Sequence, residues 1–143
     1  DLSTTLKSVG SSVITLATDF YWYGHGAAHG NYGRSFDHFL VEQKRALVAA
    51  DVFKGEDWKD KFAGMVIDKA KADLGDEWQG DDSSGTLSDE IADPSHWEFD
   101  DAGITVLFNP YDVASYARGI VEVTVPWDQL QDMVTDTAQS LSY

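Results

Sequence analysis

The chain has 143 residues with 25 acidic and 10 basic side chains, and its formal net charge of −15 excludes nucleic acid as a partner, because such a surface repels phosphate groups. Binding to anionic lipid is disfavoured for the same reason, and no apolar run reaches the about 18 residues needed for membrane insertion. A hydrophobic fraction of 43% indicates one globular domain over residues 1–143, and the absence of Cys excludes disulfides. The negative charge would attract a cationic partner, but the favoured interpretation is that it only keeps the protein in solution.

The first 41 residues predict two long strands joined by a glycine-rich loop. Residues 1–12 are polar and fit either an incoming strand or the remnant of a preceding segment, since a chain without a starting Met is typical of a mature or truncated protein. Residues 24–33 form the loop, and residues 32–41 predict the return strand of a hairpin. Alternation predicts the first strand over residues 13–23, with an apolar face made of Ile14, Leu16, Phe20 and Trp22 and an aromatic, half-polar face on the other side.

The middle of the chain predicts the main helix and a long connection. Residues 57–74 carry apolar side chains at helical spacing, and Gly75 follows as a C-terminal cap. The apolar stripe of this helix consists of Trp58, Phe62, Met65, Val66, Ala70 and Leu74. Residues 76–94 are acidic and rich in Ser and Gly, so we expect a long exposed loop there.

The remaining residues predict three short strands and two helical segments. The strands are expected at residues 97–99, 104–108 and 120–125. The middle strand is wholly apolar and β-branched, so we expect it to be buried on both faces. Residues 112–117 predict one or two helical turns, which Tyr111 and Tyr116 would hold against the sheet. An amphipathic helix is expected from Trp127 onward, because Pro126 ends the preceding strand.

Together these elements predict an α+β domain. We expect an antiparallel or mixed sheet of about five strands packed against two main helices, one over residues 57–74 and one at the C-terminus.

Three motifs, found in the same order, resemble one bacterial family. The first is G-A-A-H-G-N at residues 26–31, the second is A-D-V-F at residues 50–53, and the third is F-N-P-Y at residues 108–111, followed by Y-A-R-G at residues 116–119 and Pro126-Trp127. They resemble a domain of unknown function found in RsiV-type anti-sigma factors, in PdaC-type peptidoglycan deacetylases and in stand-alone envelope proteins. The pattern of that family at the first motif is G-G-A-H-G/P-N, from which this chain departs by an extra Ala.

The resemblance implies an extracytoplasmic α+β binding domain without a known catalytic role. A periplasmic or extracellular location is therefore expected from the family alone. In the deacetylases the chemistry belongs to a separate metal-dependent domain, which this chain lacks.

The residues themselves predict no catalytic group, metal or cofactor. His25 and His29 lie four apart, but in a loop and without the H-E-x-x-H or C-x-x-C patterns of zinc sites, so a bond from His29 to the backbone of a tight loop is the favoured alternative. The acidic residues of 76–94 do not match a calcium-binding loop. No serine elbow and no distinctive carboxylate spacing is present, so we expect a protein that is not an enzyme.

The residues expected to contact a ligand flank the glycine-rich loop and the acidic segment. Exposed Trp and Tyr side chains are good anchors for protein partners or sugar rings, although a covering helix could bury them instead. The candidates are Trp22, Tyr23, His25, His29, Asn31, Trp97, Asp81 and Asp82.

Two functions fit these observations best, and a purely structural domain of a larger envelope protein is a third alternative. The first is a non-catalytic binding or sensing module for a cationic protein, since the family that the chain resembles includes a receptor for lysozyme, which is strongly basic. The second is a peptidoglycan- or glycan-binding accessory domain of a cell-wall enzyme, by analogy with the deacetylases.

Overall fold

A long hairpin is the basis of the first sheet. In the computed structural model, which describes residues 1–26 and 28–141, strands β1 to β4 have the bounds Leu2–Val9, Val13–Trp22, Asn31–Leu40 and Arg45–Ala46. They pair antiparallel in the order β1-β2-β3-β4. The predicted hairpin is confirmed, with Val13 opposite Leu40 at one end and Trp22 opposite Asn31 at the other. Residues 1–12 supply the incoming strand.

A second antiparallel sheet contains the three strands predicted in the C-terminal part. Strands β5, β6 and β7 have the bounds Trp97–Phe99, Gly103–Phe108 and Val121–Pro126 and lie in that order. The α+β class is therefore confirmed, but the prediction of one sheet of about five strands is wrong, because the described residues form two sheets of four and three strands.

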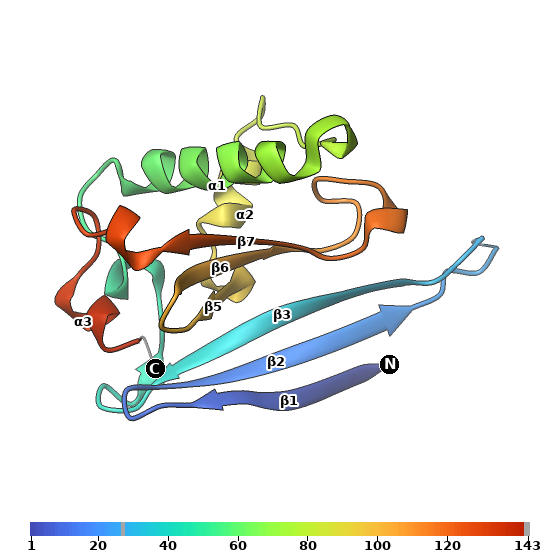
Figure 1. Ribbon diagram of the computed structural model, residues 1–143. Helices are drawn as coiled ribbons and strands as arrows, with labels where there is room; N and C mark the ends of the chain where they lie inside the picture. Colours follow the sequence, from blue (N-terminus) through green and yellow to red (C-terminus); the bar gives the residue numbers. More distant parts are fainter. Residues whose placement is uncertain (27, 142–143) are drawn as a thin grey trace.

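The three-stranded sheet is the middle layer of the molecule. Helix α1 (Trp58–Leu74) lies along one side of it, and the four-stranded sheet lies along the other (Figure 1). Adjacent residues on β6 therefore face different layers. Val106 is 0% exposed and Leu107 is 2% exposed, so both faces of the strand are covered. The prediction that this strand is buried on both faces is confirmed.

The main core lies between α1 and the middle sheet. The predicted helix is confirmed, and it begins after Asp57 and ends at Gly75, whose φ of +54° is a conformation that glycine tolerates. Its buried residues are Phe62, Ala63, Val66, Ala70 and Leu74. They pack with the apolar residues of β5, β6 and β7 in one cluster.

The buried face of β2 is the opposite of the expected one. Val13, Thr15 and Ala17 point inward, so the expected burial of Leu16 is wrong, and Leu16 and Trp22 are 36% and 51% exposed. The inner face meets the middle sheet closely, where Ala17 packs with Phe36 and Leu107. Small residues fit this contact, and the larger apolar residues of β2 lie on the outer face.

His38 connects the two sheets through buried polar contacts. Its Nε2 lies 3.1 Å from the carbonyl oxygen of Pro94, to which it must donate, so Nδ1 accepts the 2.8 Å hydrogen bond from the Thr15 hydroxyl. Burial lowers the pKa of His38, although the carbonyl of Pro94 opposes that shift. The neutral imidazole therefore belongs to the folded state.

The acidic segment is more ordered than expected. Residues 76–94 contain helix α2 (Thr86–Ile91), whose Leu87 and Ile91 are buried, so the expectation of a long exposed loop is wrong. Burial of these two side chains against the main core holds the segment in place. Short 3₁₀ turns occur at Ala49–Asp51, Gly75–Glu77, Pro94–His96, Tyr116–Arg118 and Trp127–Gln129.

The second main helix is absent from the described residues. Trp127 begins a single 3₁₀ turn, and the next helix, α3, covers only Asp136–Gln139. The helical turns expected over residues 112–117 are likewise reduced to the 3₁₀ turn Tyr116–Arg118, which Gly119 follows as the C-cap. None of the helices in residues 1–26 and 28–141 is both long and apolar enough to cross a membrane.

Candidate functional site

Two loops far apart in the sequence meet at the loop end of the β2–β3 hairpin. His29, from the hairpin loop, stacks on Tyr116 with ring centroids 3.9 Å apart. Tyr111 stacks on the same imidazole at 6.3 Å, and Tyr32 contacts Tyr116 edge-on at 5.8 Å. We call this group, His29, Tyr32, Tyr111 and Tyr116, the aromatic site.

The hydrogen bonds of His29 fix its tautomer. Its Nδ1 lies 2.7 Å from the carbonyl oxygen of Gly30, which can only accept, so Nδ1 carries the proton. Nε2 then accepts a 3.1 Å hydrogen bond from the hydroxyl of Tyr111. The bond from His29 to the backbone of a tight loop, favoured over zinc binding by the sequence, is confirmed.

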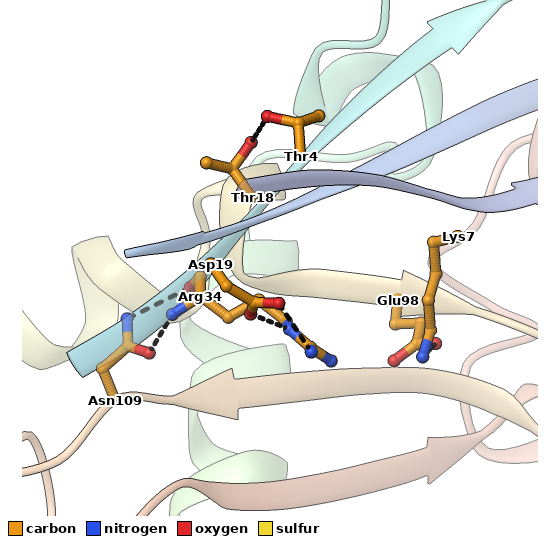
Figure 2. Close-up of polar contacts among 7 residues, drawn as sticks. All are labelled: Thr4, Lys7, Thr18, Asp19, Arg34, Glu98 and Asn109. Atoms are coloured by element: carbon orange, nitrogen blue, oxygen red, sulfur yellow. Dashed lines mark hydrogen bonds and ion pairs between the residues drawn. The ribbon is translucent and has the colours of Figure 1, made fainter. Parts of the chain in front are cut away.

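Asn109 joins the two sheets beside the aromatic site. Its Oδ1 accepts from the backbone N–H of Arg34 at 2.8 Å, and its Nδ2 donates to the carbonyl of the same residue at 3.2 Å (Figure 2). The side-chain amide thus takes the place of a neighbouring strand at the edge of β3. The guanidinium of Arg34 pairs with Asp19 through two bonds of 2.6 and 3.1 Å on the side that faces β6.

Tyr111 has an unfavourable backbone conformation. Its φ of +77° lies in the left-handed region, which costs a residue other than glycine about 1–2 kcal/mol. The turn that carries it is closed by the bond from the Asp112 N–H to the Asn109 carbonyl, and the tyrosine ring is 55% exposed. Strain at an exposed aromatic side chain is a reason to suspect a functional position.

The start of the acidic segment lies next to the loop that carries the two tyrosines. The N–H of Gln79 donates to the carbonyl of Val113 at 2.7 Å, and Arg118 pairs with Glu77 at 3.3 Å. The two sequence regions expected to form recognition edges, the glycine-rich loop and the acidic segment, therefore both contact residues 109–119.

A second carboxylate contact ties α2 to the same loop. Burial, followed by a hydrogen bond to Asp112 and the charge of that carboxylate, raises the pKa of Glu90 to about 9. Asp93 adds negative charge, and His96 Nδ1 lies 3.7 Å from Glu90 Oε1. Asp112 also accepts from the N–H of Asn109 at 2.9 Å. The raised pKa favours the protonated form of Glu90 at neutral pH, in which its carboxyl group can donate to the Asp112 carboxylate.

This pair predicts a pH-dependent stability. In the unfolded chain the pKa of Glu90 is near 4.5, whereas in the folded protein it is about 9. Between these two pH values the folded state binds one proton more than the unfolded state, so the free energy of unfolding falls as the pH rises. Glu90→Gln keeps a donor toward Asp112 without a titratable proton. At pH 8 we expect the variant to be more stable than the wild type by about 1–2 kcal/mol, reduced by screening of a partly exposed group.

Urea denaturation of both proteins at pH 5 and pH 8 measures this difference. The free energy of unfolding of the wild type should drop more steeply between the two pH values than that of Glu90→Gln. Equal slopes would contradict the raised pKa of Glu90.

The structure places the candidate ligand residues in different environments. Trp22 and Tyr23 are 51% and 58% exposed, and His25 is exposed as well, so these three are accessible at the end of the hairpin. His29 belongs to the aromatic site. Asn31 begins β3, and its side-chain oxygen accepts from the N–H of Tyr32 at 2.9 Å.

Trp97 is buried, whereas Asp81 and Asp82 are exposed and accept local hydrogen bonds. Trp97 is 0% exposed and its indole N–H donates to the carbonyl of Ile91, so its expected role as an exposed anchor is wrong. Asp82 accepts from the N–H and hydroxyl of Ser88, and Asp81 accepts from the N–H of Ser83. These bonds lower the pKa of both carboxyl groups and order the turn before α2.

Metal ligands do not converge within the described part of the chain, where no three His, Asp or Glu side chains are grouped around a possible ion. Ala27, the extra residue of the first motif, lies outside the described residues. The sequence did not single out Asn109 or Glu90 as individual contacts. The F-N-P-Y motif was the available signal for Asn109, whereas Glu90 had no signal because its partner is distant in sequence.

Comparison with known proteins identifies the family of this chain, but that family has no known activity. Residues 50–128 match a family described as a protein of unknown function, DUF3298. No curated protein matches the sequence.

Two solved structures share the fold. A DUF3298 family member from Bacteroides fragilis is 25% identical, with a TM-score of 0.80 over 98% of this chain and 56% of the other. A DUF3298 family protein from Pseudomonas aeruginosa is 18% identical, with a TM-score of 0.68 over 96% of this chain and 62% of the other. The chain therefore spans less than two thirds of the length of either relative.

Proposed function

The chain belongs to the DUF3298 family of proteins of unknown function, and we propose that it is a non-catalytic binding module of the bacterial cell envelope that recognises a cationic protein. A lysozyme-like protein is the first candidate, because lysozyme sensing is known in the RsiV-type proteins that the sequence motifs resemble.

The observation that carries this proposal is the uncompensated negative charge. Six of the ten Lys and Arg side chains lie in ion pairs, and each of these pairs engages one carboxylate. Most of the 25 acidic side chains therefore have no Lys or Arg partner within the described residues. Such a surface attracts a basic protein and accelerates its association.

Charge alone gives weak attraction, so the proposal also requires apolar anchors. Trp22 stacks on Phe20 at 5.5 Å, and its ring is half exposed at the end of the hairpin. Tyr23 follows it and is 58% exposed. Exposed Trp and Tyr side chains of this kind are frequent energetic centres of protein interfaces.

Calorimetry with lysozyme at low and physiological salt tests the proposal. We expect binding that persists at physiological salt, where the screening length is about 8 Å, and that weakens about tenfold in Trp22→Ala. Binding that disappears at physiological salt would mean charge attraction alone. No binding at either salt would remove the support for a lysozyme-like partner.

A glycan is the second candidate ligand, and the aromatic site favours it. The half-exposed ring of Tyr111 lies beside His29 and Tyr116, and exposed tyrosine rings stack on sugars. In this alternative the module is an accessory domain of a cell-wall enzyme. Titration with soluble peptidoglycan fragments would then show saturable binding that Tyr111→Ala abolishes and Trp22→Ala preserves.

A further inference from the structure

The face of the four-stranded sheet that points away from the middle layer is unusually apolar. We call it the outer face. Pairing in register brings Leu2 opposite Phe20, Leu6 opposite Leu16, and Val9 opposite Ile14 on this side. Leu2 is 78% exposed, Leu6 56% and Val9 63%. The hydrogen-bonded hydroxyls of Thr4 and Thr18 lie on the side of the sheet opposite Asp19 and Arg34, which places them on the outer face too (Figure 2).

The outer face ends in a groove. Its volume is about 530 Å³, and it lies between β3, the segment 46–49 and the turn 93–95. Leu16, Phe39 and Val48 line it with apolar surface and are each at least 36% exposed. Two carboxylates, those of Asp37 and Asp93, also line the groove. Asp93 uses Oδ1 to accept from the N–H of Ser95, whereas Asp37 is exposed on the strand.

This combination suits a long basic side chain. Lys and Arg cover apolar surface with their aliphatic stems while the charged head reaches a polar group. In the groove the stem would lie against Leu16 and Phe39, and the head would reach Asp37. An anionic group would meet two carboxylates and no Lys or Arg among the lining residues, because His38, which also lines the groove, is neutral in the folded state.

The charge of the chain selects among possible occupants. A second copy also carries −15, so like-charge repulsion opposes self-association. An anionic membrane is repelled for the same reason. A basic protein with apolar side chains gains both from the long-range field and from burial of the outer face.

We propose that the outer face and its groove form the docking surface for the basic partner, with a Lys or Arg side chain of that partner held in the groove beside Asp37. This inference rests on the proposed function and adds the location and chemistry of the contact. Trp22, at the other end of β2, belongs to the same face and extends the contact along the strand.

Two matched pairs of variants test the location, with lysozyme as the probe at physiological salt. Asp37→Asn and Asp101→Asn remove the same charge from exposed positions, but only Asp37 lines the groove. Phe39→Ala and Tyr21→Ala truncate aromatic residues that are 43% and 48% exposed, but only Phe39 lies on the outer face, because Tyr21 lies on the opposite face of β2. We expect Asp37→Asn and Phe39→Ala each to weaken binding about tenfold, and the controls to change it less than twofold.

The outcomes separate this inference from the proposed function. If wild-type binding persists but the members of each pair behave alike, the partner docks elsewhere, which overturns the inference and leaves the proposed function intact. If the wild type does not bind, both fail. Light scattering on the free protein supplies a further arm, because a dimer that Phe39→Ala dissociates would make a second copy the occupant and overturn the inference. Unchanged melting curves of the four variants establish that they fold.

Discussion

Replacing Trp97 with Ala is expected to lower the free energy of unfolding by about 3–5 kcal/mol, the usual cost of truncating a buried aromatic residue. Trp97 is 0% exposed and contacts Phe53 and Phe62 with its ring at centroid distances of 5.4 and 5.9 Å. Its indole N–H donates to the carbonyl of Ile91 at 2.7 Å. The substitution therefore opens a cavity in the main core and leaves a buried carbonyl at the end of α2 without its donor.

Two controls separate these contributions. Trp97→Phe keeps an aromatic ring but loses the donor, and we expect a cost of about 1–3 kcal/mol. Trp22→Ala removes a half-exposed tryptophan and should cost less than about 1 kcal/mol. Urea denaturation monitored by circular dichroism measures all three. A cost for Trp97→Ala similar to that of Trp22→Ala would contradict a core position.

Trp97 also shows why part of the fold could not be predicted. The sequence places this residue after a polar acidic segment, which suggested exposure. Its burial depends on α2, a six-residue helix too short for a clear periodic signal, and on contacts with residues more than 30 positions away in α1. In contrast, α1 and β6 were predictable because each has a continuous apolar pattern matched to its own period.

The two faces of β2 illustrate a second limit. Alternation correctly predicts the strand, but it does not say which face is buried. The inner face carries Val13, Thr15 and Ala17, because the middle sheet approaches closely there. The more apolar face points outward, so the assumption that greater hydrophobicity means burial fails at this strand. A strand whose apolar face is exposed is itself a sign of an interaction surface.

The aromatic site was predictable in its components but not in its geometry. His29 and Tyr111 are 82 residues apart, and only the tertiary structure brings their side chains within hydrogen-bond distance. The motifs identified both stretches. At Gly30 an added Cβ would lie within 2.5 Å of the Tyr21 ring, so any larger residue would force that ring to shift. Spacing could not show that Asn109 would bind the backbone of β3 between them.

Replacing Asn109 with Ala is therefore expected to loosen this end of the molecule, at a cost of about 2–3 kcal/mol, because it removes two hydrogen bonds and leaves the N–H and carbonyl of Arg34 without these partners. The loss acts on the junction between β3 and the loop after β6, where Tyr111 and Tyr116 contact His29. Hydrogen exchange should consequently show a faster-exchanging amide at Arg34.

Asn31→Ala is the matched control. Asn31 is also an asparagine next to the hairpin loop, but among the described residues its side-chain oxygen accepts from the adjacent N–H of Tyr32, at 2.9 Å. A local bond of this kind is worth about 1 kcal/mol or less, and its loss should not change protection at Arg34. If Asn109→Ala leaves the Arg34 amide as protected as in the wild type, the link between the sheets must come from packing. If protection is lost only in Asn109→Ala, the side-chain amide joins the sheets and positions the aromatic site.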